Sequence, residues 1–230
     1  MDVARFIQIY VVQGLFALFF LYMAYVVLRR GRKTLNIYLS SFYLSVTIGG
    51  IINIIYANIF VDTIVFVMHF LTYYLFCFSM IFLLIFVLIL IKPAKTITPK
   101  FQILILSILG LLILWLIFIP NGITINASTN WKPKWDWIFF LYSILICSCL
   151  IIVPTIYYSI KIYKKFENDY LRKKWIYFLI GISAYFFLYY GTSLSNTLND
   201  DTFRLIWSLI SLPTLISLYL IYYGVGRQLE

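Results

Sequence analysis

The chain carries few side chains that could do chemistry, and it has a single histidine, His69. The sequence contains no His-Glu-x-x-His, Gly-x-Ser-x-Gly or Cys-x-x-Cys motif and no glycine-rich phosphate loop. No Asp, Glu or Lys stands in the middle of an apolar run, and the last run has no lysine for a Schiff base with retinal. Membrane enzymes still need acids, bases, nucleophiles or metal ligands, so we predict no catalytic activity, no metal site and no cofactor.

The remaining polar groups have a spacing that suits binding. His69, Tyr73, Phe76 and Met80 follow one another at intervals of four, three and four residues, which places them on one face of a helix. Asn53 lies in the same way on a polar face of the preceding apolar run. An unpaired amide that faces lipid is costly, so both faces are expected to point into a helix bundle.

We therefore predict an outward-opening pocket between the second, third, sixth and seventh apolar runs. Its predicted lining residues are Asn53, His69, Tyr73, Tyr190, Ser193, Asn196, Arg204 and Trp207. Interhelical packing is the alternative, because Asn53 can bridge two helices and a lone histidine on an aromatic face is often simply packed. Glycines at positions 49, 50, 181 and 191 are expected to allow close approach of helices.

Composition indicates which elements must hold these residues. Of the 230 residues, 63% are apolar and 11% are charged, and the mean hydropathy is +0.97. Soluble domains have about 25% charged and about 45–50% apolar residues. A membrane-spanning helix takes about 20 residues, so the chain has room for seven spans and little else. We predict an all-α polytopic membrane protein, a single seven-helix domain over residues 1–230. The predicted spans are 6–28, 35–59, 63–91, 101–119, 137–160, 175–198 and 203–223.

The basic residues predict how these spans are oriented. Of the 18 Lys and Arg, 14 lie in alternate connections, at residues 29–33, 92–100, 161–174 and 224–230. The opposite side holds only Arg5, Lys132, Lys134 and Arg204. By the positive-inside rule the N-terminus is outside, the C-terminus is cytoplasmic, and the chain crosses the cell membrane. With the acids included, Asp2 and Glu230 among them, the net charge is +11 inside and −1 outside. The charge of +10 therefore needs no nucleic-acid partner.

Two connections carry further signals. A basic segment between the fifth and sixth spans contains Lys161, Lys164, Lys165, Arg172, Lys173 and Lys174. Such a segment attracts the anionic headgroups of the lipid bilayer, and a docking surface for a protein partner would use the same residues. Asn126-Ala127-Ser128 matches the glycosylation acceptor pattern in the longest outer connection.

Three stretches resemble the N-terminal seven-helix sensor region of some histidine kinases. They read AYVVLRRGRKTLNIYLSSFYLSVTIGG, YYSIKIYKKFENDYLRKKWIYFLIGI and LPTLISLYLIYYGVGR. The resemblance implies a sensor without enzymatic activity. Because the sequence stops at Glu230, it also implies a stand-alone module that signals through a separate cytoplasmic protein or as a homodimer.

The expected function is that of a receptor-like membrane protein that binds a small or lipidic ligand from the outer side. Proline at positions 154 and 213 supplies expected flex points. A transporter of small solutes or lipids is the first alternative, and a structural membrane subunit without catalysis is the second. The Asp-Arg-Tyr and Asn-Pro-x-x-Tyr motifs of G-protein-coupled receptors are absent, so that likeness rests on topology alone.

Overall fold

The computed structural model describes residues 6–92 and 96–226. Within these ranges it contains seven helices that are long and apolar enough to cross a membrane, which confirms the predicted all-α, multi-pass architecture. Arg5, Lys95 and Arg227, which were counted for the orientation, lie outside the described residues, as do Asp2 and Glu230.

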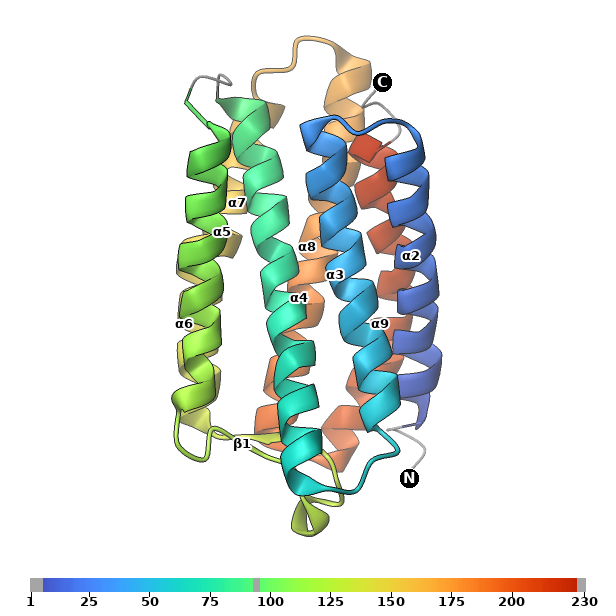
Figure 1. Ribbon diagram of the computed structural model, residues 1–230. Helices are drawn as coiled ribbons and strands as arrows, with labels where there is room; N and C mark the ends of the chain where they lie inside the picture. Colours follow the sequence, from blue (N-terminus) through green and yellow to red (C-terminus); the bar gives the residue numbers. More distant parts are fainter. Residues whose placement is uncertain (1–5, 93–95, 227–230) are drawn as a thin grey trace.

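The helices follow the chain in simple order (Figure 1). The first is a π-helix, η1 (Ile7–Gln13), that continues as α2 (Gly14–Arg29). Next come α3 (Thr34–Tyr56), α4 (Asp62–Ile91) and α5 (Pro99–Leu114), which ends in the 3₁₀-helix η2 (Trp115–Phe118). The fifth span consists of α6 (Trp137–Cys147), the π-helix η4 (Ser148–Ile152) and α7 (Val153–Tyr163). The chain continues through α8 (Asp169–Leu198), α9 (Asp201–Ile221) and the π-helix η5 (Tyr222–Gly226).

Capping residues explain the largest difference from the predicted spans. The sixth span was predicted to begin at residue 175, where the apolar run starts, whereas the helix α8 begins at Asp169. The Asn168 side chain accepts hydrogen bonds from the backbone N–H groups of Tyr170 and Leu171. Such a cap satisfies two N–H groups that the first helical turn leaves without partners. The helix can therefore extend well beyond the apolar segment.

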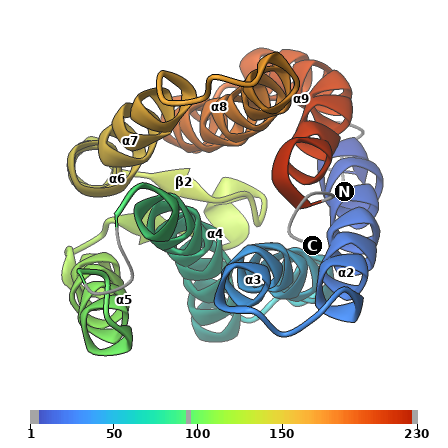
Figure 2. The same cartoon turned by 90° about the horizontal axis from the view of Figure 1, so that it is seen from above.

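Seen from above, the helices are arranged in a ring (Figure 2). Helix α4 packs against α3, α5 and α7, and its residues 79–88 are almost all buried. Helices α2, α3, α8 and α9 complete the ring, while α5 lies at the periphery beside α4. The position of α4 explains why its sequence is apolar on every face.

A short hairpin lies at one end of the bundle (Figure 1). Strands β1 (Ile123–Thr124) and β2 (Lys134–Trp135) pair antiparallel, and the 3₁₀-helix η3 (Ala127–Thr129) lies between them. We call residues 122–136 the hairpin and this end of the bundle the hairpin end; η1 begins here too. The opposite end, where α7 ends and α8 begins, is called the basic end.

Both prolines that were expected to act as flex points lie within helices. Pro154 is the second residue of α7, two positions after the end of the π-helical segment η4. Because proline lacks an N–H and its ring crowds the preceding turn, a wider turn at this point relieves the conflict. Pro213 lies inside α9, between the hairpin end and the basic end.

Candidate functional site

A cavity of about 200 Å³ lies inside the bundle next to the hairpin. Its walls come from η1, α2, α3, α4, α8 and α9, and the hairpin contributes Lys132, Pro133 and Trp135. The four helices that the sequence analysis placed around a pocket all take part. Seven of the eight predicted lining residues contact this space: Asn53, His69, Tyr73, Ser193, Asn196, Arg204 and Trp207.

Tyr190 is the exception, and its predicted place in the lining is corrected here. Its hydroxyl group lies 2.6 Å from Ser148 Oγ, on the side of α8 that faces the fifth span. Successive residues on a helix point about 100° apart, so the neighbouring Tyr189 faces the cavity instead. Both residues are tyrosines, and residue type alone did not distinguish them.

His69 is held by hydrogen bonds on both ring nitrogens. Trp135 Nε1 of the hairpin donates to His69 Nε2 at 3.1 Å, and the Tyr56 hydroxyl lies 2.8 Å from His69 Nδ1. Since an indole N–H can only donate, Nε2 must be the unprotonated nitrogen. The imidazole is therefore neutral, carries its hydrogen on Nδ1 and donates it to the Tyr56 oxygen. His69 both lines the cavity and ties the hairpin to α3 and α4.

Asn53 also combines packing and lining. Its amide nitrogen donates to the side-chain oxygen of Gln13 in η1, and both side chains border the cavity. This hydrogen bond bridges α3 and η1, as the interhelical alternative expected. Lining and bridging are thus compatible at this residue.

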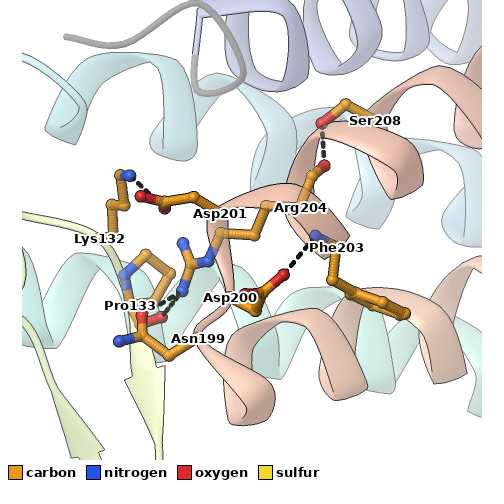
Figure 3. A network of polar contacts seen from close by, with 8 residues as sticks. All are labelled: Lys132, Pro133, Asn199, Asp200, Asp201, Phe203, Arg204 and Ser208. Atoms are coloured by element: carbon orange, nitrogen blue, oxygen red, sulfur yellow. Dashed lines mark hydrogen bonds and ion pairs between the residues drawn. The ribbon is translucent and has the colours of Figure 1, made fainter.

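Charged residues lie at the hairpin end of the cavity (Figure 3). Arg204 Nη2 donates to the Pro133 carbonyl at 2.6 Å and to Asn199 Oδ1 at 2.9 Å. Lys132 Nζ lies 2.6 Å from Asp201 Oδ1 at the start of α9. These contacts, together with the one between Trp135 and His69, fasten the hairpin to α9 and to α4.

The middle of the bundle holds a chain of hydroxyl groups. Tyr73 and Tyr189 each lie within hydrogen-bond distance of Ser143 Oγ, at 2.7 and 2.6 Å. Deeper in the bundle, the Tyr185 hydroxyl lies 2.8 Å from Ser79 Oγ. These bonds join α4, α6 and α8. They provide hydrogen-bond partners for polar groups that lipid would leave unpaired.

The cavity changes character with depth. Near the hairpin its walls carry amide, imidazole, guanidinium and ammonium groups. Farther from the hairpin the lining includes Phe16, Phe76, Met80 and Leu188, together with Tyr185 and Ser211. Among the described residues that line it, none is an Asp or Glu. Nor do the described residues include a group of three or more His, Cys, Asp or Glu side chains that could hold a metal ion. The arrangement suits reversible binding of an amphipathic molecule.

The basic segment divides between surface and interior. Lys161, Lys164, Lys165, Arg172 and Lys173 are exposed. Lys174 is buried, with Nζ 3.3 Å from the centre of the Tyr223 ring, so its predicted place on the headgroup or docking surface is corrected. A lysine ammonium is attracted to an aromatic face, and this attraction holds the side chain against η5. The Arg30 guanidinium lies over the neighbouring Tyr222 and bonds its hydroxyl group.

Asn126 lies half-buried at the tip of the hairpin. Its Oδ1 accepts hydrogen bonds from Ser128 N and Ser128 Oγ, at 3.0 and 2.7 Å, and it caps η3. Glycosylation of this residue stays a prediction.

Comparisons with known protein families, characterised proteins and solved structures give no match, so the chain is assigned to no family. The case for a function therefore depends on the cavity. Sequence reasoning did not find Lys132 and Trp135, because their side chains form hydrogen bonds with residues 66 or more positions away.

Proposed function

We propose that this protein is a multi-pass membrane receptor or sensor that binds a small or lipidic ligand in the cavity at the hairpin end. The observation that carries the proposal is the cavity itself, with polar groups beside the hairpin and aromatic and aliphatic side chains below. Binding sites in membrane bundles commonly combine an apolar wall with a few placed polar groups. Signalling would pass to a separate cytoplasmic protein or through a homodimer.

Helix α9 offers a route from the cavity to the basic end. Arg204 and Trp207 in its first turns line the cavity, and Tyr222 and Tyr223 follow its last turn. There Tyr222 contacts Arg30 after α2, and Tyr223 contacts Lys174 in α8. A ligand that displaced the cavity half of α9 would alter these cation–π contacts, and Pro213 lies between the two halves.

The orientation is part of the proposal. Most of the described basic residues lie at the basic end, so the positive-inside rule puts the hairpin outside and the basic segment in the cytoplasm. A thiol-labelling experiment tests this placement in a Cys149→Ser background, which removes the exposed cysteine. We expect a membrane-impermeant maleimide to label Ser128→Cys in intact cells and to reach Lys165→Cys only after the cells are permeabilised. The reverse pattern would overturn the orientation.

A reconstitution experiment tests the function. An environment-sensitive dye on Lys165→Cys, in proteoliposomes, should change its emission when decanol or decanesulfonate is added. Ser193→Leu would fill part of the cavity and should abolish this response, whereas Ser107→Leu, on an exposed position of α5, should retain it. Vesicle uptake of decanesulfonate should equal that of protein-free vesicles.

The two alternative functions predict other results in the same vesicles. Protein-dependent uptake of decanesulfonate would favour a transporter. A dye that does not respond, together with no uptake, would favour a structural subunit.

A further inference from the structure

Two basic side chains line the cavity at the hairpin end. Lys132 and Arg204 line it there, His69 is neutral, and none of the described lining residues is acidic. Asp201 pairs with Lys132, but its side chain is 77% exposed, whereas the Lys132 side chain is 12% exposed. The carboxylate is therefore largely hydrated, whereas the Lys132 side chain is mostly buried and lines the cavity.

The uncharged part of the cavity is elongated. Lining residues of α4 run from His69 to Met80, eleven positions along the helix, which corresponds to roughly 16 Å. The deeper residues on this face, Phe76 and Met80, are apolar, and Phe16 of α2 also lines the cavity. With a volume of about 200 Å³ the cavity is smaller than the ~300–1,000 Å³ of sites for drug-sized ligands. A narrow apolar tail suits this space better than a bulky ring system.

We propose that the ligand is a single-chain amphiphile with an anionic head, such as a carboxylate, sulfonate or phosphate. The head lies beside Lys132 and Arg204, and the tail extends past Phe76 to Met80. This inference rests on the proposed function, since it names the class of ligand that the cavity takes.

Charge and hydration explain why an anionic head is favoured. An exposed ion pair contributes little because water screens it, so the partnership of Lys132 with the exposed Asp201 is weak and easily shared. An anion inside the cavity meets the same ammonium where less water competes, and there the attraction is stronger. A cationic head would be repelled by both basic residues, and an uncharged head would gain neither interaction.

Binding measurements on the full chain test the inference. The chain would be placed in nanodiscs of zwitterionic phosphatidylcholine, so that the bilayer itself attracts no anion. Tryptophan fluorescence reports binding, because Trp135 and Trp207 line the cavity. The probes are decanesulfonate, decanol with the same tail but no charge, and ethanesulfonate with the same head but almost no tail. We expect decanesulfonate to bind about tenfold more tightly than decanol, as one charge-assisted contact implies, and ethanesulfonate not to bind.

Two variants of one ion pair make the test sharper. Lys132→Gln should weaken decanesulfonate binding about tenfold, whereas Asp201→Asn removes a competing carboxylate and should strengthen it several-fold. Decanol binding should change in neither variant. Lys134→Gln is the matched control, because Lys134 lies in the same hairpin, is exposed and does not line the cavity.

Each other result overturns a defined part of the argument. Equal affinity for decanol and decanesulfonate would overturn the anionic head and leave the proposed cavity function standing. Tight binding of ethanesulfonate would overturn the amphiphile. If Lys132→Gln and Asp201→Asn changed decanesulfonate affinity in the same direction, the pair would act through hairpin stability and the inference would fail. Absence of binding by all three probes would overturn the inference and the proposed function together.

Discussion

Replacing Gly181 by alanine should lower the free energy of unfolding by about 2–3 kcal/mol, the upper range for overpacking a close contact. A Cβ added at Gly181 in α8 would lie 2.7 Å from the Ile221 backbone nitrogen and 2.6 Å from its Cγ1. Backbone cannot rotate away as a side chain can, so α8 and α9 would have to separate. Unfolding of the purified protein in mixed detergent micelles, followed by circular dichroism, measures the loss.

Gly14 provides the matched control for this substitution. It lies at the start of α2 in helical conformation, and a Cβ added there would meet nothing within 4 Å. Gly14→Ala should therefore leave stability unchanged or raise it by about 0.5–1 kcal/mol, because alanine restricts the unfolded chain more than glycine does. Equal losses in both variants would contradict close packing of α8 against α9 as the cause.

The same two helices show what a glycine in the sequence can predict. The expected close approach is confirmed at Gly181, and at Gly191 an added Cβ would overlap the Trp207 ring. Glycine carries this information because only the absence of a side chain lets two helix backbones come so near. Which helix approaches is not encoded at the glycine itself, and neither Ile221 nor Trp207 was identified as a partner.

The predictable part of the candidate site follows from the constraints of lipid. Because a bilayer leaves polar groups without partners, faces that carry Asn53, His69 and Ser193 had to turn inward, and these residues line one cavity. The same constraint does not determine whether Tyr189 or Tyr190 faces the cavity. Helix α8 is aromatic on several sides, so its sequence does not determine its rotation about its own axis.

The hairpin contacts could not be predicted for a different reason. Loops lack the periodicity that assigns a face, and Trp135 and Lys132 reach partners on α4 and α9. Three positive-φ residues near the turn, Asn121, Asn130 and Trp131, fold this segment back over the bundle. Trp135 is buried although it lies in a connection between two helices.

Trp135→Phe should increase hydrogen exchange of the hairpin about tenfold. The phenylalanine ring can keep the contacts that Trp135 makes with Tyr73 and Phe139, but it has no N–H to donate to His69. A buried acceptor that loses its donor costs about 1–3 kcal/mol, and about 1.4 kcal/mol corresponds to tenfold more of the open form. Exchange of the Asp136 amide reports this opening directly, because in the closed hairpin it donates to the Gly122 carbonyl.

Trp137→Phe is the control that separates the hydrogen bond from the ring. Trp137 lies two residues further along, is 52% exposed and contacts Phe140 rather than His69, so its replacement should leave hairpin exchange unchanged. If both variants exchanged alike, the indole N–H would not be what holds the hairpin.

Because the hairpin covers the cavity, its opening should also change the rate at which the ligand dissociates. Decanesulfonate should dissociate faster from Trp135→Phe by about the same tenfold factor, in stopped-flow fluorescence, if it leaves past the hairpin. An unchanged dissociation rate alongside faster exchange would show that the ligand leaves between the helices instead.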